Sequence, residues 1–440
     1  AQEFKDGCCV STWIAVSCKA MKHKSLRSVA NSVAFMCFNY GFNTGIIAGA
    51  LLYLELAFPE LKSDKLLNGA VTSSILFSAF LSNTVVGPLA DWIGRVPLLQ
   101  LTNIPFVLGG IIVALAESPE AVILGRSITG VAVGVAGTLP NLYIAEIAPP
   151  ESRGRFVGIA PMCITIGIMT SQLFAVAVAE VLGESSCTSF GWRIMFGFGA
   201  IPALFQSIWS LGIPESPRWC YQKNQIERAE RNSKMLASLI GGAPIEVPAP
   251  GAAQQSAGRT RLSLKLAAIA GGLSAMQQLS GINAVVFYAP KIYQELGFIN
   301  TLAILISSCI SILQVMVVYG LTRLVDSWGR RKLCKIGIIG MIGGHLLLGL
   351  TFSFNLPVWL AIMGMLSFRL LFSLSMGPLP YIMVTELFPQ QQRARGVAAS
   401  MMVNWILNWV VVFSVPKLMQ VYNGYVFFAF AAVCVVSYFV

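Results

Sequence analysis

The feature that most constrains this chain is a succession of apolar stretches, each long enough to cross a lipid bilayer. A transmembrane helix needs about 20 predominantly apolar residues. Charged residues make up only 11% of the chain, whereas a soluble domain averages about 25%. The sequence therefore predicts an all-α, multi-pass membrane protein. Its twelve expected transmembrane helices are residues 28–54, 68–90, 97–116, 121–145, 156–181, 191–213, 262–293, 301–325, 333–352, 357–384, 395–420 and 424–440.

The net charge of +11 is explained by where the basic residues lie. Most Lys and Arg residues fall in the N-terminal segment or in the loops after spans 2, 4, 6, 8 and 10. Cytoplasmic loops carry an excess of Lys and Arg, so we expect these segments and both termini in the cytoplasm, and the plasma membrane as the location. The charge thus indicates the lipid bilayer, and no nucleic acid, as a partner. The basic first 27 residues lack a long apolar core, so we expect no cleavable signal peptide there.

The longest break between spans divides the chain into two halves. Residues 215–239 have helical character, and residues 241–258 are rich in Gly, Ala and Pro, as in a flexible linker. Because the chain ends inside the last span, we expect a native tail beyond it. The expected division is a cytoplasmic segment at 1–27, a six-helix bundle at 28–213, a cytoplasmic helical segment with a linker at 214–261, and a second six-helix bundle at 262–440.

The two halves repeat each other, as in proteins built from internal repeats. Three motifs recur in the same order, two of them 240 positions apart (41 and 281, 146 and 386). Two parallel six-helix halves with a site at their interface are typical of major facilitator transporters. The matched pairs are Gly-x-Asn at 41–43 and 281–283, Asp-x-x-Gly-Arg at 91–95 and 326–330, and Glu-x-x-Pro-x-x-x-Arg at 146–153 and 386–393.

The seventh span contains unusual polar residues. Gln277, Gln278 and Asn283 fall within seven residues, beside Gly281. Amide groups in hydrocarbon are unfavourable without hydrogen-bond partners. Because amides both donate and accept and carry no charge, they suit a neutral, polyhydroxylated ligand, and Gly281 lets the helix open beside them. The alternative is polar contact between helices, but three amides in a helix interrupted by glycine favour the ligand site.

Acidic and basic residues recur together on the cytoplasmic side. Coupled ion pairs there could form a charge latch that closes this side, with each pair contributing about 0–1 kcal/mol. The alternative is that the charges only set topology. The latch candidates are Asp91, Arg95, Glu146, Arg153, Glu215, Arg218, Asp326, Arg330, Arg331, Glu386 and Arg393.

Several longer motifs extend over most of the chain. They are GFNTGIIAG at 41–49, GPLADWIGR at 87–95, GRSITGVAVGVAGTLPNLYIAEIAPPESRG at 125–154, PESPRW at 214–219, QQLSGIN at 277–283, VDSWGRR at 325–331, GPLPYIMVTELFP at 377–389 and NWILN at 404–408. In these motifs the chain resembles the sugar porter family of the major facilitator superfamily, and most closely its facilitative hexose transporters. The resemblance implies the major facilitator fold, with two pseudo-symmetric six-helix bundles.

The resemblance also implies a sugar site and a gate. The implied sugar contacts are Gln172, Gln277, Gln278, Asn283, Gln314, Asn404, Trp405 and Asn408. The indole of Trp405 offers an apolar face to a pyranose, and Gln314 stands where the family usually has Asn. Tyr288 and Tyr381 are gate candidates. Tyr381 replaces a Trp of the family motif, and the alternative for Tyr288 is a tyrosine at the membrane interface.

Span 1 bears on how transport is driven. Proton-coupled sugar porters carry Asp where this chain has Asn43, which cannot titrate, and Glu55 is the one weak nearby candidate for a proton site. We therefore expect a uniporter of a hexose, with glucose first and fructose second, acting as a monomer. The alternatives are a proton-coupled sugar or polyol symporter and a sugar sensor that does not transport. The sequence contains no pattern of an enzyme, and it implies no cofactor and no metal.

Overall fold

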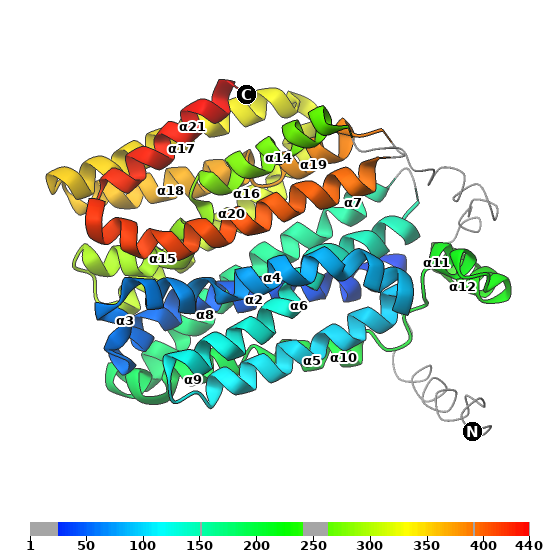
Figure 1. Cartoon of the computed structure of the whole chain (residues 1–440), viewed down its shortest axis with the longest axis horizontal. Coiled ribbons are helices and arrows are strands. Elements are labelled where there is room, and N and C mark those ends of the chain that lie inside the picture. The colour runs from blue at the N-terminus through cyan, green and yellow to red at the C-terminus, as the bar shows by residue number, and fades with distance from the viewer. Residues whose placement is uncertain (1–24, 150–151, 241–262, 390–391, 440) are drawn as a thin grey trace.

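The computed structural model describes residues 25–149, 152–240, 263–389 and 392–439, and every regular element in these ranges is a helix (Figure 1). The first half contains α2 (Leu26–Ala57), α3 (Glu60–Ser63), α4 (Lys65–Ile93), α5 (Arg95–Ala114), α6 (Pro119–Ile147), α7 (Arg153–Val157), α8 (Ile159–Ser186), the π-helical turn η1 (Cys187–Gly191), α9 (Trp192–Gly197) and α10 (Ala200–Trp209). Next come α11 (Pro217–Gln222) and α12 (Ile226–Ile240). The second half contains α14 (Leu264–Leu279), α15 (Ile282–Glu295), α16 (Asn300–Trp328), α17 (Arg330–Phe354), α18 (Val358–Leu374), α19 (Leu379–Leu387), α20 (Arg393–Tyr422) and α21 (Tyr425–Phe439).

The helices confirm the predicted spans. Nine helical segments of the described chain are long and apolar enough to cross a membrane. One of them, Gly154–Trp209, holds two predicted spans, which separate at Gly183, where the backbone is not helical. The two remaining spans are α14 with α15, which are too short singly, and the shorter apolar helix α21. The predicted helical character of 215–239 appears as α11 and α12, whereas the predicted segment 1–27 and linker lie mostly outside the described residues.

The helices are arranged as two bundles side by side (Figure 1). Elements α2 to α10 form one bundle and α14 to α21 the other, and α11 and α12 project at one end. Between the bundles, α4 packs against α20, α8 against α16 and α2 against α15. We call the end that carries α11 and the turn at Gly94 the charge-cluster end, and the end that carries α3 the opposite end.

The loops at the opposite end begin their helices with capping side chains. The carboxylate of Asp64 accepts from the backbone N–H groups of Leu66 and Leu67 at 2.8 and 3.1 Å, and Ser118 accepts from that of Ala121 at 3.3 Å. Such side chains satisfy N–H groups that have no partner within the helix. The helices can therefore begin directly after short loops.

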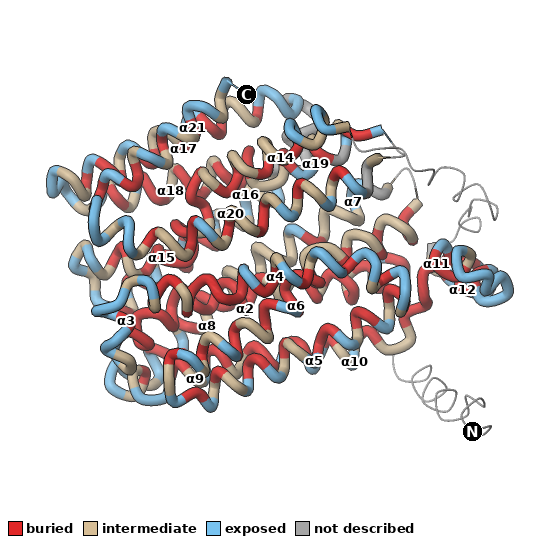
Figure 2. The backbone as a smooth tube through the Cα atoms, viewed as in Figure 1, coloured by how far each residue is buried: buried red, intermediate tan, exposed pale blue. Residues whose placement is uncertain are grey.

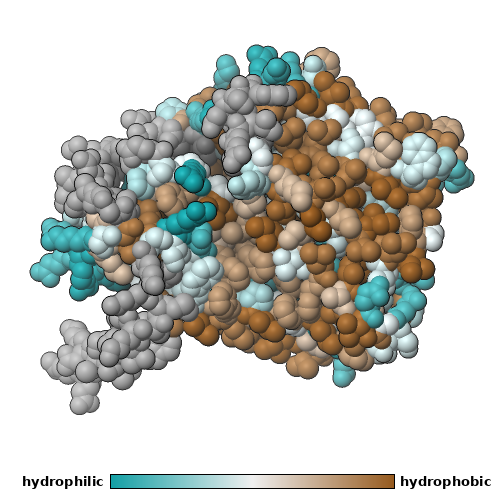
Figure 3. Space-filling model, turned by 180° about the vertical axis from the view of Figure 1, so that it is seen from behind, coloured by the Kyte–Doolittle hydropathy of each residue, from teal (hydrophilic) through white to brown (hydrophobic). Residues whose placement is uncertain are grey.

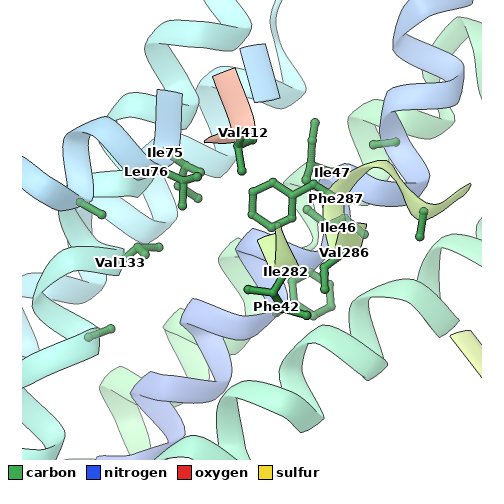
Figure 4. Close-up of a cluster of buried hydrophobic side chains, with 14 of the residues drawn as sticks. Phe42, Ile46, Ile47, Ile75, Leu76, Val133, Ile282, Val286, Phe287 and Val412 are labelled. Atoms are coloured by element: carbon green, nitrogen blue, oxygen red, sulfur yellow. The ribbon is translucent and has the colours of Figure 1, made fainter. Parts of the chain in front are cut away.

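Buried residues run along the centres of both bundles (Figure 2). One cluster joins them: Phe42 and Ile46 of α2 and Ile75 of α4 lie with Phe287 of α15 and Val412 of α20 in a common core (Figure 4). The two halves are therefore packed against each other around α15.

The outer surface suits a bilayer. Leucine, isoleucine and valine side chains such as Leu81, Val85, Ile104 and Ile201 are at least half exposed. Figure 3 shows a broad hydrophobic face with hydrophilic groups gathered toward its rim. An exposed apolar face of this kind marks contact with lipid, so the prediction of a multi-pass membrane protein is confirmed.

The seventh span is broken between α14 and α15, as its glycine predicts. Gly281 has φ +81°, a left-handed conformation that favours glycine. A Cβ atom there would lie 2.7 Å from the ring of Phe430. The ring nitrogen Nε2 of His345 lies 2.9 Å from the carbonyl oxygen of Ser280, which the break removes from the helical ladder. The backbone conformation and the packing thus require glycine at the break, and His345 pairs with the carbonyl oxygen that the break frees.

Candidate functional site

Four of the predicted sugar contacts form one continuous chain of amides beside the helix break. Asn283 donates to Gln278 at 2.8 Å, and Gln278 donates to Asn404 at 3.0 Å. Asn404 donates in turn to Gln277 at 2.6 Å. Only Asn283, at the end of this chain, is partly exposed, and the other three are buried. The arrangement fixes the direction of each amide, which preorganises donors and acceptors on one surface.

The far end of this chain is anchored on the polypeptide between α18 and α19. The Nε2 of Gln277 donates to the carbonyl oxygens of Met376 and Gly377 at 2.7 and 2.8 Å. Tyr381 lies in α19, and its side chain is 41% exposed although the amides are buried. The role of Tyr381 as a gate remains a proposal.

Trp405 and Asn408 extend the site toward the first half. The indole of Trp405 is 3% exposed and lies 5.9 Å from the ring of Tyr40, which belongs to α2. The Nε1 of Trp405 and the Oδ1 of Asn408 are buried and have no hydrogen-bond partner. Buried polar atoms are usually paired, so these two atoms are suited to contact a bound molecule.

Gln172 and Gln314 lie in a second polar group that the sequence did not reveal. Ser311 of α16 donates to Gln172 of α8 at 2.5 Å, a contact between the two halves. Arg369 of α18 donates to Ser311 at 2.8 Å and to Gln314 at 2.9 Å. Arg369 was not among the predicted residues, although a lone arginine inside an apolar span is a signal of a functional residue.

Tyr288 is buried inside the molecule, not placed at a lipid interface. It is 4% exposed, and its hydroxyl donates to the carbonyl oxygen of Val412 at 3.1 Å. The interpretation as a tyrosine of the membrane interface is therefore wrong. Its position between α15 and α20 leaves the gate as the remaining proposal.

The charged motifs of the first half meet at one turn. Arg95 makes two bonds to Glu146, at 2.9 and 3.1 Å, and a third to Asp91 at 2.9 Å. Glu215 accepts from the backbone N–H groups of Arg95, Val96 and Ser216 at 3.2, 3.1 and 2.8 Å. Burial raises the pKa of Glu215, although these N–H groups and Arg95 partly offset it. This network fastens the segment before α11 to the turn between α4 and α5.

The matched motif of the second half forms a more exposed pair, Arg330 with Glu386. The turns are alike, since Gly94 and Gly329 both have positive φ, +112° and +76°. At the charge-cluster end, each ion pair among the described side chains joins residues of a single half, so a latch between the halves remains a proposal. Arg218 and Arg331 are exposed, and the side chains of Arg153, Asp326 and Arg393 lie outside the described part of the structure.

At the opposite end, charged side chains do connect the halves. Lys291 of α15 contacts Glu55 of α2 at 2.6 Å. Asn68 of α4 donates to the same Glu55 at 2.8 Å, and Asn300 of α16 donates to Glu184 of α8 at 2.6 Å. A cavity of about 130 Å³ lies beside the pair of Lys291 and Glu55. The structure therefore represents a state in which the halves are joined at the opposite end.

Comparison with known proteins places this geometry in a family. The family model described as Sugar (and other) transporter matches residues 29–440. The plastidic glucose transporter 4 of Arabidopsis thaliana is 31% identical over 434 residues, which cover 94% of this chain and 77% of that protein. The glucose transporter GlcP of Staphylococcus epidermidis is 32% identical over 407 residues, which cover 90% of this chain and 89% of that protein.

A solved structure agrees with the fold. The xylose transporter XylE from E. coli, in a partially occluded inward-open conformation, has a TM-score of 0.83 and 25% identity, and the match covers 94% of this chain and 96% of that one. The same proton:xylose symporter bound to 6-bromo-6-deoxy-D-glucose gives a TM-score of 0.78. The predicted major facilitator fold is confirmed.

Proposed function

The chain belongs to the sugar (and other) transporter family, and from this premise we propose that it is a uniporter that carries a hexose, with glucose as the first candidate. Transport of sugar by alternating access follows from the family and the fold. The identity of the sugar and the absence of coupling are the parts proposed here. We take a single chain as the functional unit and the plasma membrane as its location.

The observation that carries the hexose proposal is the chain of amides that ends at Gln277. A hexose presents hydroxyl groups that both donate and accept, and the amides of Asn283, Gln278 and Asn404 can do the same. The indole of Trp405 supplies the apolar face that the C–H side of a pyranose needs. Relatives named as glucose transporters support this substrate.

Uniport rests on Asn43. This residue is 5% exposed in α2, and its amide donates to the carbonyl oxygen of Asn39 at 2.9 Å. An amide does not exchange protons at physiological pH, so position 43 cannot couple sugar movement to a proton. Proton-coupled symport is the second candidate, because XylE is a proton:xylose symporter. Glu55 does not favour symport, since Lys291 compensates its charge in the present state.

We assign the structure to the inward-facing state. The halves are joined at the opposite end by Lys291 and Glu55, and the TM-score is higher with the inward-open XylE than with the sugar-bound one. In this assignment the charge-cluster end is cytoplasmic, as the positive-inside rule predicts for the basic loops.

Uptake of labelled glucose and fructose into liposomes tests the proposal. Uptake should stop when the inside and outside concentrations are equal, and an imposed pH gradient should not change it. Accumulation above the outside concentration, abolished by an uncoupler, would assign the chain to symport. Saturable glucose binding without any uptake would assign it to a sensor.

A further inference from the structure

Arg369 is a buried cation near the middle of the membrane-spanning segment Val358–Val384. Its side chain is fully buried. A charged side chain at this depth is costly, and such residues generally pair with another group or mark the path of a substrate. The surroundings of Arg369 therefore need an explanation.

The partners of Arg369 are all neutral oxygens. Its guanidinium donates to Ser311 at 2.8 Å, to Gln314 at 2.9 Å and, over longer distances of 3.4 and 3.5 Å, to the carbonyl and hydroxyl of Ser307. Its Nε is buried and has no acceptor among the described residues. The positive charge thus remains uncompensated by any carboxylate among these partners.

Arg126, another buried arginine inside a span, offers a comparison. Arg126 of α6 donates to the backbone carbonyls of Val71 and Thr72 at 2.8 and 3.0 Å, and its guanidinium lies 5.4 Å from the ring of Phe196. Those backbone acceptors belong to the same half and satisfy Arg126 as part of the bundle. The acceptors of Arg369 also lie in its own half, on α16, but one of them, Ser311, donates across the interface to Gln172 of α8. The polar group of Arg369 therefore reaches the other half, whereas both backbone acceptors of Arg126 stay within its own half.

The hydrogen bonds around Arg369 fix the direction of the neighbouring polar groups. A guanidinium can only donate, so Gln314 turns its carbonyl oxygen toward Arg369 and its NH₂ group away. Ser311 accepts from Arg369 and donates to the carbonyl oxygen of Gln172. The Nε2 of Gln172 is then left without a partner, although Gln172 is fully buried.

We propose that the subsite of Gln172, Gln314 and Arg369 receives a carboxylate, so that the transporter accepts sugar acids such as hexuronates besides neutral hexoses. This inference rests on the proposed function, and on Gln172 and Gln314 contacting the sugar as the family resemblance implies. A hydroxyl group would bring a hydrogen that needs an acceptor, whereas a carboxylate only accepts and also compensates the charge of Arg369. The Gln172–Ser311 bond joins the two halves, so their separation would free the subsite for the ligand.

Three ligands bound to the purified full chain test the inference: glucose, glucuronate and glucuronamide, the neutral amide of the same shape. Affinity is measured from the shift of the thermal unfolding midpoint with ligand concentration. Glucuronate should bind at least about tenfold more tightly than glucuronamide, which corresponds to about 1.4 kcal/mol. Arg369→Gln should reduce this ratio to below threefold, and Arg369→Lys should restore most of it.

The ratio for the parent chain decides the matter even where Arg369→Gln does not fold. Equal binding of glucuronate and glucuronamide to the parent would overturn the inference. The inference would also be overturned if chloride, compared with methanesulfonate, raised the thermal unfolding midpoint at least as much as glucuronate does. The site would then bind a free halide. Glucose binding and uptake, measured in parallel, test the proposed function separately.

Discussion

The side chain of Asn404 donates to the side-chain oxygen Oε1 of Gln277 at 2.6 Å and accepts from Nε2 of Gln278 at 3.0 Å, so that one residue of α20 contacts two consecutive glutamines of α14. This relationship couples the orientations of the two glutamines through a single amide. It also means that the proposed sugar site lies on two packed helices, which hold it more rigidly than a loop would.

Asn404→Ala should therefore weaken glucose binding by about tenfold. The substitution removes two hydrogen bonds, each with a net value of about 0.5–1.5 kcal/mol, and so loosens the orientation of Gln277 and Gln278. Gln277→Ala should have a similar effect, and Asn283→Ala should also weaken binding. Affinity is measured by isothermal titration calorimetry on the purified variants.

The matched control is Gln420→Ala, which removes an exposed amide from the same helix. Its affinity for glucose should equal that of the parent chain. Unchanged affinity in Asn404→Ala as well would exclude the amide chain from the sugar site.

Gly281→Ala should destabilise the fold, because the position combines a left-handed backbone with contact against Phe430. The backbone cost is about 1–2 kcal/mol, and displacement of the aromatic ring costs about 1–3 kcal/mol. Gly272→Ala is the control: Gly272 lies in α14 with no atom within 4 Å of an added Cβ. Unfolding in mixed micelles should show a lower free energy of unfolding for Gly281→Ala alone. Equal stability of the two variants would argue against a strained break.

The sequence anticipated the elements that depend on local pattern. Runs of apolar residues located the spans, and Gly281 beside three amides located the broken helix. Contacts between distant residues could not be anticipated in the same way. Glu55 and Lys291 are separated by 236 positions and share no motif, so only the packed halves reveal the pair.

The charge motifs show the same limit. Repetition of Glu and Arg at matched positions predicted that acids and bases meet, and Arg95 does contact Glu146. The pattern could not tell whether a pair lies within a half or between halves, because both arrangements use the same residues. Arg369 was missed because its neutral partners, among them Ser311 and Gln314, come from a different helix.

Arg95 allows a direct comparison of a buried and an exposed partner. Glu146 is 7% exposed and Asp91 is 66% exposed, and both carboxylates contact the same guanidinium at 2.9 Å. Glu146→Ala should lower the free energy of unfolding by about 3–5 kcal/mol, because it leaves a buried charge without its main partner. Asp91→Ala should lower it by about 0–1 kcal/mol. Chemical unfolding in micelles measures both, and similar losses for the two variants would contradict the assigned burial.

The ion pair between Lys291 and Glu55 should control the balance between the two transport states. It joins the halves at the opposite end, where Glu55 is only 4% exposed. Lys291→Gln leaves that carboxylate buried without a cation while the end stays closed, whereas water can solvate it once the end opens. The variant should therefore shift the population toward the state open at the opposite end.

Val415, which lines the cavity beside the ion pair, is a position for a reporter cysteine. With Val415→Cys in a chain that also carries Cys309→Ser, a thiol reagent restricted to the opposite end should label Lys291→Gln about tenfold faster than the parent, since each 1.4 kcal/mol of bias is a factor of ten. Glu55→Gln combined with Lys291→Gln removes both charges, so no unpaired charge then opposes closure. The labelling rate of this double variant should lie between those of Lys291→Gln and the parent. Lys417→Gln changes an exposed lysine of α20 and should be labelled at the same rate as the parent.

If Lys291→Gln were labelled no faster than Lys417→Gln, the pair of Lys291 and Glu55 would have no part in closing this end. The hydrophobic core around Phe287 and Val412 would then have to hold the halves together alone.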